Sequence, residues 1–404
     1  MGIRFSILAA GLVMALAGTA QAQVSGDTVK IGILNDQSGL YADIAGQGSV
    51  LAARMAIEDF GGTVLGKKIE LVTADHQNKA DIGSSIANRW IDTEGVDAIM
   101  DVPNSGVALA VQEIARTKKR VFVAVGPATS DLTGKACSGT GFAWMYDTFM
   151  LANGTGAALA KEGGDSWFFV TANYAFGQAL ERDTTAALKA AGGKVVGSVN
   201  FPLNNADFSS FLLQAQGSGA KVIGLASAGG DTINAIKQGH EFGIGASNDQ
   251  RLAGLLVFLT DVHSLGLDIA KGLVLTESFY WDLDEGTRTW SKRFMDKFNG
   301  RAPTMIHAGV YSAVAHYLKS IEAAGTDESV AVAAKMHAIK VNDFASHDAV
   351  VREDGRVVRD AYLFQVKTPA ESKAPWDYYK LLARIPAEKV TRPLAESECP
   401  LVKK

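Results

Sequence analysis

Residues 29–48 read VKIGILNDQSGLYADIAGQG, a short apolar run followed by small and polar residues. The first six residues have the pattern of a buried β-strand. A helix is expected to begin near Gln47, because the apolar positions of 50–60 recur at intervals of three and four and the run stops at Gly61-Gly62. The loop between strand and helix is therefore either a simple connection or a place where a ligand sits.

The same strand–loop–helix pattern recurs along the chain. In a first series we expect strands at 68–74, 96–102 and 120–126, with helices at 81–95 and 106–119. A second series begins at residue 166, with strands at 166–172, 194–201, 221–227 and 251–258 and helices at 176–193, 206–219 and 231–243. Apolar strands that alternate with helices predict parallel sheets covered on both faces. The fold class is α/β, with two Rossmann-like lobes.

The rest of the chain departs from this alternation. A return segment at 271–281 precedes two helices, at 286–300 and 307–325. Residues 348–366 predict two strands around Asp354-Gly355, a hairpin signal, and 376–386 is strand-like. The length of 404 residues, 47% of them apolar, is too great for one compact core and agrees with two domains.

Charge and motifs exclude several functional classes. A net charge of −4 and a pI near 6.0 give no reason to expect nucleic acid. The stretch GQGSVL (46–51) imitates a dinucleotide fingerprint only in part, and no phosphate-binding loop or nucleophile elbow occurs. None of the seven histidines has the spacing of a metal pair. We therefore expect no catalytic residues, no cofactor and no metal; a hydrolase built on Ser105 would need a histidine close in space.

The N-terminus predicts a secretory signal peptide. Arg4 is basic, the following run to Ala17 is apolar apart from Ser6 and Gly11, and Ala20-Gln21-Ala22 has the form of a cleavage site. Cleavage near Ala22 would release a periplasmic protein without a membrane span. A membrane anchor is the alternative, although the run is shorter than the ~20 residues that a span needs.

The chain contains two cysteines, Cys137 and Cys399. In an oxidising compartment two cysteines usually pair. We expect a disulfide that ties the C-terminal tail to the first lobe, with two free thiols as the alternative.

Ligands of open parallel sheets bind beyond the carboxyl ends of the strands. The loops at these ends are 35–48, 101–106, 126–131 and 172–176, and all are rich in small polar or aromatic residues. The loop after the first strand is thus one of a matched set, which favours a ligand site over a connection.

The chain resembles the periplasmic substrate-binding proteins of branched-chain amino acid ABC transporters, the leucine/isoleucine/valine-binding type. The resemblance is carried by the stretch quoted at the start, by GKKIELVTADHQNKAD (66–81) and by YAFGQAL (174–180). The resemblance covers about residues 27–366. It implies a type I periplasmic binding fold, in which a three-segment hinge joins two lobes that close on a small ligand. The expected parts are a signal peptide (1–22), a first lobe (23–146 and 277–350), a second lobe (147–276 and 351–390) and a tail (391–404).

The resemblance also implies a ligand set and partners. Ser105 matches a serine that contacts the ligand carboxylate, and Asn104 lies beside it. Ala128 and Thr129 match a second pair of residues that contacts the ligand, and Ser130 is adjacent to them. Tyr174 and Phe176 match an aromatic residue that closes over the ligand, and Tyr41 and Asp43 are expected at the rim. Tyr146, near the first crossover, and Phe279 are further aromatic residues expected at the cleft. The partner is a membrane permease, and the protein is expected to be a monomer.

Several of these residues have structural alternatives. Ser105 could be an ordinary helix N-cap, and Tyr174 and Phe176 could be core residues. Asp43 could be a solvated loop charge, and Phe279 could pack in the hinge. Ser105, Thr129 and free amides at a helix start would hold a carboxylate without an Arg or Lys.

One stretch departs from the amino-acid-binding members, which carry an acidic residue there for the ligand ammonium. The matching region, Leu255–Phe258, is apolar, and no carboxylate occurs before Asp261. An unpaired buried ammonium would cost several kcal/mol. We therefore expect a small carboxylate with an aromatic or branched aliphatic body; a branched-chain amino acid, an amide, or a sensing rather than transport role are the alternatives.

Overall fold

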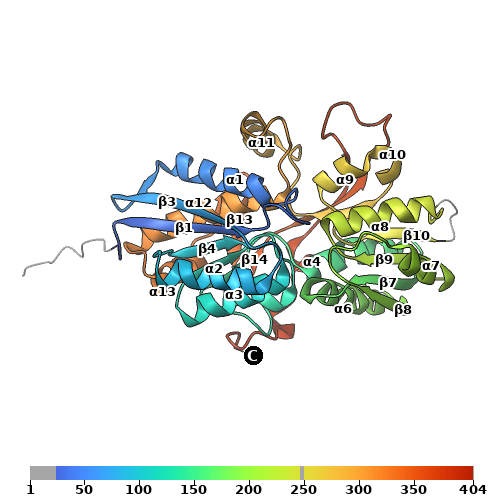
Figure 1. The fold of residues 1–404 in the computed structure, drawn as a ribbon, viewed down its shortest axis with the longest axis horizontal. Helices are drawn as coiled ribbons and strands as arrows, with labels where there is room; N and C mark the ends of the chain where they lie inside the picture. Colours follow the sequence, from blue (N-terminus) through green and yellow to red (C-terminus); the bar gives the residue numbers. More distant parts are fainter. Residues whose placement is uncertain (1–23, 246–249, 404) are drawn as a thin grey trace, which may run out of the picture.

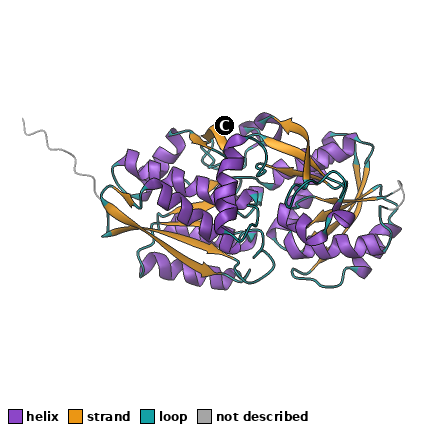
Figure 2. Cartoon of the chain, turned by 90° about the horizontal axis from the view of Figure 1, so that it is seen from above, coloured by secondary structure: helices purple, strands orange, loops and turns teal. Residues whose placement is uncertain are grey.

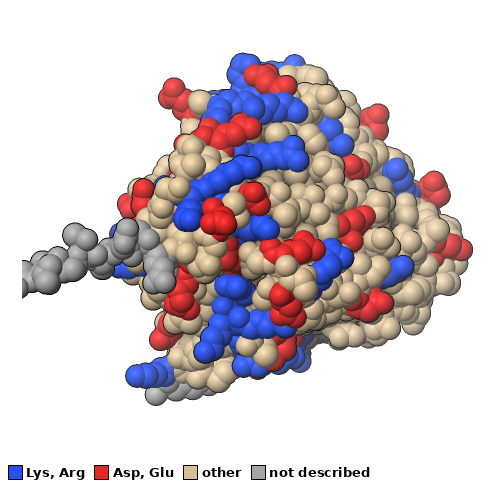
Figure 3. All heavy atoms as spheres, turned by 60° about the vertical axis from the view of Figure 1, so that its left-hand side comes forward, with Lys and Arg blue, Asp and Glu red and all other residues tan. Residues whose placement is uncertain are grey.

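The computed structural model describes residues 24–245 and 250–403 and consists of two α/β lobes side by side (Figures 1 and 2). The expected signal peptide lies outside the described residues. No helix of the described residues is long and apolar enough to cross a membrane. On the end of the first lobe, basic and acidic side chains are interspersed (Figure 3).

The first lobe is built on a six-stranded sheet in the order β2-β3-β1-β4-β5-β6. All neighbours are parallel except the short β2, and β1 pairs with both β3 and β4. The strands are β1 (Thr28–Asn35), β2 (Thr63–Val64), β3 (Lys67–Asp75), β4 (Ala98–Asp101), β5 (Val121–Ala124) and β6 (Gly141–Ala143). The ends of β1, β4 and β5 therefore meet at one edge, as the sequence predicts.

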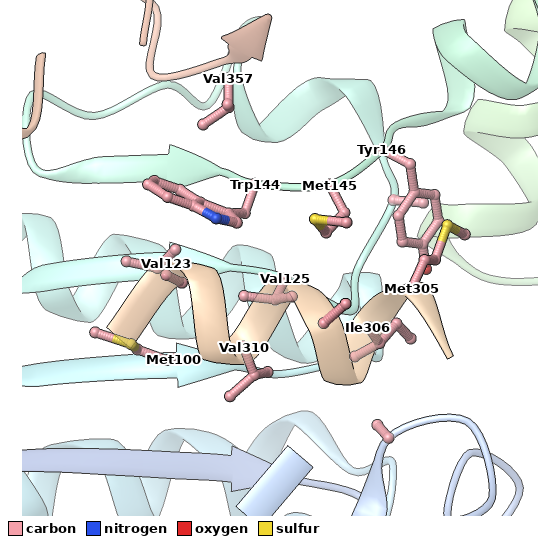
Figure 4. Packing of buried hydrophobic residues seen from close by; sticks show 14 of the residues in the cluster. Met100, Val123, Val125, Trp144, Met145, Tyr146, Met305, Ile306, Val310 and Val357 are labelled. Carbon is pink, nitrogen blue, oxygen red and sulfur yellow. The ribbon is translucent and has the colours of Figure 1, made fainter. Parts of the chain in front are cut away.

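Helices cover both faces of this sheet. On one side α1 (Gly46–Phe60) packs against α12 (Met305–Ala324), and on the other α2 (Ala80–Asp92) packs against α3 (Ser105–Thr117). Figure 4 shows Met100 and Val123 of the sheet facing Val310 and Ile306 of α12, with Tyr146 at the end of this core beside Met305. The apolar stripes of the helices thus place Tyr146 where the first lobe meets the second.

The second lobe has a four-stranded parallel sheet in the order β10-β9-β7-β8. Its strands are β7 (Ser166–Ala172), β8 (Lys194–Phe201), β9 (Val222–Ala226) and β10 (Arg251–Gly254). Along β7, Trp167 and Phe169 belong to one core and Phe168 and Val170 to another, because successive strand side chains point to opposite faces. The helices are α6 (Ala175–Ala190), α7 (Ser209–Gly217), α8 (Gly229–Glu241), α9 (Leu259–Leu265) and α10 (Leu267–Ala270).

The chain passes between the lobes three times. The first passage lies between β6 and α4 (Thr148–Leu151), and the second between β11 (Val274–Glu277) and α11 (Glu285–Lys297). The third lies near Arg359, between β14 (Val357–Val358) and β15 (Ala361–Val366). The boundary expected at residue 350 is therefore too early, because β14 still pairs with β13 (Ser346–Val351) of the first lobe and Arg356 bridges to Ala143.

The hairpin expected around Asp354-Gly355 is present as β13 and β14. The strand expected at 376–386 is β16 (Tyr379–Ile385), which pairs with β15 in a small sheet with β11. The strand expected at 251–258 ends at Gly254, because Leu255–Phe258 turn toward the start of α9. The sequence reading missed β12 (Val341–Asp343), α13 (Ser329–Ala338) and the helical segment 148–161, which contains a π-turn at 152–156.

The C-terminal tail lies near the junction of the lobes (Figures 1 and 2). The expected disulfide joins Cys137 to Cys399, with a Cα–Cα distance of 5.6 Å. The helix α14 (Ala387–Val390) directly precedes the tail and contacts α4 at the start of the second lobe. The tail therefore starts at the second lobe and is fastened by the disulfide to the first.

Candidate functional site

A small cavity with an empty volume of about 210 Å³ lies between the lobes, at the carboxyl ends of the strands. The first lobe and the first crossover contribute six wall residues and the second lobe contributes four. They are Tyr41, Ile44, Pro103, Gly126, Ala128 and Tyr146, and Tyr174, Phe176, Ala228 and Leu256. The loops predicted to face a ligand therefore meet in one place.

The loop after β1 is shaped by one buried carboxylate. Asp36 accepts hydrogen bonds from the backbone N–H groups of Gly39 and Tyr41, both at 2.8 Å, and from the side chain of Asn78. A side chain at Gly39 would sit 2.9 Å from this carboxylate, so glycine lets the loop fold back on Asp36. The turn directs Tyr41 toward the second lobe, where its hydroxyl is hydrogen-bonded to that of Tyr174.

The chain turns sharply at the end of β4. Asp101 and Val102 both have positive φ, at 81° and 55°, which is unfavourable for a β-branched residue. The backbone oxygen of Asp101 accepts from Val125 and Gly126, and its carboxylate accepts from Asn35 at 3.1 Å. These bonds hold the strained turn, which brings Pro103 to the cavity wall.

Asn104 follows this turn and is the N-cap of α3. Its side chain accepts from the backbone N–H groups of Gly106 and Val107. The expected ligand role of Asn104 thus competes with a capping role that already occupies its side-chain oxygen.

Ser105 lies beside the loop after β5. Its Oγ accepts from the N–H groups of Ala128 at 3.3 Å and Thr129 at 3.2 Å. A hydroxyl that accepts from two amides keeps its own hydrogen to donate, and long amide bonds of this kind are weak. Ser105 and Thr129 are buried directly behind Ala128, which is the member of the three that lines the cavity. We call Ser105, Ala128 and Thr129 the cradle.

Two helices of the second lobe begin at the cavity. Tyr174 is the N-cap of α6 and Ala228 the N-cap of α8, and neither start has a side-chain cap. The free N–H groups and positive dipole ends at such starts favour a negative charge. The wall itself contains no charged side chain.

Four buried carboxyl groups lie close to the wall residues without belonging to the wall: Asp101, Asp261, Glu277, and Asp231, which accepts from the N–H groups of Asn204 and Asn205. Burial raises the pKa of Asp101 to about 6 and that of Asp261 to about 7, and it also raises the pKa of Glu277. Asp261 accepts from the N–H of Phe258, and Glu277 accepts from the hydroxyl of Tyr379 at 3.0 Å. Each of these groups already has a protein donor.

The tyrosines of the wall stay protonated. Burial, followed by the neighbouring Tyr174, raises the pKa of Tyr41 and of Tyr146 well above the ordinary value. Tyr146 donates to the backbone oxygen of Gly126 at 2.5 Å. Within the Tyr41–Tyr174 pair one hydroxyl hydrogen serves the bond, which leaves the other hydrogen to donate elsewhere.

Six expected site residues do not line the cavity: Asn104, Ser105 and Thr129, which lie next to the wall, and Asp43, Phe279 and Ser130, which have other partners. Asp43 is exposed and pairs with Arg301 at 2.8 Å, as a solvated loop charge would. Phe279 is buried against Trp290 and Phe344, which agrees with hinge packing. Ser130 points away from the cavity and donates to Asp183 at 2.7 Å, because the short helical turn that begins there rotates its side chain toward the second lobe.

The sequence reading missed Ile44, Pro103, Gly126, Ala228 and Leu256, all of which line the wall. Pro103 and Gly126 lie in the loops 101–106 and 126–131, which the sequence predicts to face a ligand because they follow strand ends. Ala228 and Leu256 follow β9 and β10, and the loops after these two strands are not among those predicted to face a ligand. Leu256 lies in the apolar stretch Leu255–Phe258, which offers no carboxylate.

Residues 28–373 match the family model described as periplasmic binding protein. The Leu/Ile/Val-binding protein homolog 6 of Brucella melitensis biotype 1 is 25% identical over 365 residues, 87% of this chain and 91% of its own length. The matched region includes every residue of the cavity wall.

Two crystal structures from Burkholderia extend this similarity. A periplasmic binding protein of Burkholderia mallei is 49% identical with a TM-score of 0.91, covering 93% of this chain and 100% of its own. A branched chain amino acid ABC transporter periplasmic ligand-binding protein of Burkholderia xenovorans LB400 is 41% identical with a TM-score of 0.83 and the same coverage. The similarity spans both lobes and the hinge.

Proposed function

The chain belongs to the periplasmic binding protein family, of the substrate-binding type that serves ABC transporters and is not enzymatic, and we propose that its ligand is a small carboxylate with an aromatic or branched aliphatic body. The protein would capture this acid between its lobes and deliver it to a membrane permease. The observation that supports this most strongly is a cavity wall without a charged side chain, beside a cradle of neutral donors.

The cradle suits a carboxylate. The amides of Ala128 and Thr129, after β5, meet the hydroxyl of Ser105 at the start of α3 through long hydrogen bonds, which the oxygens of a ligand carboxylate could replace. The open starts of α6 and α8 add partial positive charge from the other lobe. A carboxylate held in this way needs no Arg or Lys.

The wall suits an apolar body and offers no partner for an ammonium group. Leu256 lines the cavity where a carboxylate would be needed, and the buried carboxyls of Asp261 and Glu277 are already hydrogen-bonded to the protein. Tyr41, Tyr146, Tyr174 and Phe176 supply aromatic faces. A solute binding protein from R. palustris with the same fold, at 20% identity, is known in complex with benzoate, so this fold can hold an aromatic acid.

A thermal-shift screen with matched pairs of compounds tests the proposal. Benzoate and benzamide differ in charge, and 4-methyl-2-oxopentanoate and leucine share a skeleton but differ in the ammonium group. Stabilisation should follow RT ln(1 + [L]/Kd) for the acids and be small for benzamide and leucine. Strong stabilisation by leucine or valine and none by the simple acids would show that the carboxylate proposal is wrong.

The variant Ser105→Ala/Thr129→Ala removes the only side-chain donor of the cradle and the hydroxyl beside it but keeps both amides, so it should strongly reduce the shift given by the best acid while the protein stays folded. Thr93→Ala is the matched control, because the Thr93 hydroxyl is exposed and bonds only to Arg89 of its own helix. Loss of folding in the double variant would instead assign both residues a structural role. Gene neighbours separate transport from sensing: permease and ATPase genes favour uptake, and a two-component kinase gene favours sensing.

A further inference from the structure

Asp183 of α6 is a buried carboxylate of the second lobe whose hydrogen-bond donors come from its own helix and from three other parts of the chain. Its Oδ2 accepts from Ser130 of the first lobe at 2.7 Å and from Thr148, at the first crossover, at 2.6 Å. Its Oδ1 accepts from Arg182 at 3.1 Å and from Arg392 of the C-terminal tail at 3.2 Å. This carboxylate is the meeting point of both lobes, the hinge and the tail.

The donors of Asp183 are directly connected to the cradle. Thr148 donates its backbone N–H to the oxygen of Ala128 at 2.7 Å, and its hydroxyl accepts from the N–H of Ser130 at 3.1 Å. The segment that carries the Ala128 and Thr129 amides is thus held on either side by groups that bind Asp183. A movement of α6 relative to the first lobe would pull on this segment.

The neighbouring Arg182 strengthens the same junction. It donates to the hydroxyl of Ser130 at 2.9 Å and pairs with Asp131 of the first lobe at 3.1 Å. Hydrogen bonds to a carboxylate are stronger than those between neutral groups, especially when water is excluded. Four donors on one buried carboxylate, two of them the buried hydroxyls of Ser130 and Thr148, therefore favour one relative position of the lobes over others.

We propose that Asp183 is a positioning residue that locks the cradle of the first lobe to the second lobe when the cleft closes. The contacts join protein groups to one another, so they stabilise the closed arrangement by themselves, and a ligand on the cradle adds to them. The role of Ala128 and Thr129 as ligand donors rests on the proposed function, whereas the lock does not.

The test measures the distance between nitroxide labels at Arg116→Cys on α3 and Lys189→Cys on α6 in the full chain with its disulfide intact. Both positions are exposed, one on each lobe. Without added ligand, the label pair should show a population at the separation given by this structure. Ser130→Ala should lower the closed-to-open ratio about fivefold, and Asp183→Asn by more than about tenfold, since it also weakens the bonds to both arginines.

Adding Ser130→Ala to Asp183→Asn should change the ratio little, because the shared bond is already weakened. Asp165→Asn is the control: it is an exposed acid of the second lobe that pairs only with Lys221 of the same lobe, and should leave the distances unchanged. If Asp183→Asn does not fold, the same distances are measured in Ser130→Ala and Thr148→Val, each of which removes one donor of Asp183.

Absence of the short distance in the unsubstituted chain, or its full retention in these variants, would overturn the proposal. A merely structural role would lower the unfolding temperature without moving the distance populations. The readout needs no ligand, so a failed screen of acids does not affect it.

Discussion

The hydroxyls of Tyr41 and Tyr174 are hydrogen-bonded to each other across the cleft, one from each lobe. Both rings also line the cavity, so the contact that joins the lobes is part of the wall that a ligand would touch. Closing the lobes and completing the cavity are therefore one event, as hinge closure around a ligand requires.

Tyr41→Phe should weaken binding of the best acid from the screen about fivefold. The change removes one side of the interlobe bond and leaves the buried hydroxyl of Tyr174 without this partner, a cost of about 1 kcal/mol. Isothermal titration calorimetry measures the effect. Tyr317→Phe is the control, because the Tyr317 hydroxyl is buried in the first lobe and has no hydrogen-bond partner among the described residues. Equal affinities of the Tyr41 variant and the unsubstituted protein would argue against the interlobe role.

Gly229→Ala should oppose closure. Gly229 begins α8 with a φ of 57°, and an added Cβ would sit 2.7 Å from the backbone oxygen of Leu40 in the other lobe. Gly219→Ala shares the positive φ, at 69°, but meets no atom within 4 Å. Both variants should lose about 1 kcal/mol of stability from backbone strain, but only Gly229→Ala should also lose the short interlobe distance. Identical distance distributions for the two would contradict this reading of the interface.

Replacing both cysteines by serine should lower the free energy of unfolding by about 2–4 kcal/mol. The Cys137–Cys399 bond closes a separation of 262 residues and therefore restricts the unfolded chain strongly. Urea unfolding with and without reductant provides the measurement. In reductant the unsubstituted protein should fall to the stability of the variant; a difference that persists there would have to come from the serines themselves.

Asp261→Asn should stabilise the protein at pH 8 and have little effect at pH 4. Burial raises the pKa of Asp261 from 3.8 to about 7. At pH values between these two, Asp261 is therefore protonated in the folded state and ionised in the unfolded state. Its stability contribution is thus most favourable below about pH 4 and becomes unfavourable as the pH rises toward 7. The neutral amide avoids this loss, which for a shift of this size is on the order of 4 kcal/mol at pH 8.

Chemical unfolding of the Asp261→Asn variant and the unsubstituted protein at several pH values tests this. The difference between them should grow from pH 4 to pH 7 and then level off. The Asn side chain can still accept from Phe258, so helix α9 keeps its cap. A difference that is constant with pH would mean that Asp261 is ionised throughout.

Much of the fold could be predicted because its strands are apolar and end in small or polar loops. The strand at Thr28–Asn35 and the helix that stops before Gly61 follow from local pattern alone. The segment 148–161 and α13 were not predicted, although Asp147 and Glu328 cap their first turns, because both are short and apolar and so show no clear helical period.

The site was predicted in part for the same reason. Loops at strand ends meet, so Tyr41, Ala128, Tyr146, Tyr174 and Phe176 could be placed at the cavity from sequence. Side-chain direction could not be predicted: Ser130 follows the cradle by one residue, yet turns to Asp183, a contact that depends on how the two lobes dock. Asp43 and Phe279 likewise have partners that are distant in sequence.

A crystal structure of the protein with the acid that stabilises it most tests the central claim directly. We expect a carboxylate whose oxygens lie within hydrogen-bond distance of the Ser105 hydroxyl and the Ala128 and Thr129 amides, with its apolar body between Tyr41, Tyr174 and Leu256. A ligand whose carboxylate lies elsewhere in the cleft, or whose positively charged group faces Asp261 or Glu277, would contradict it.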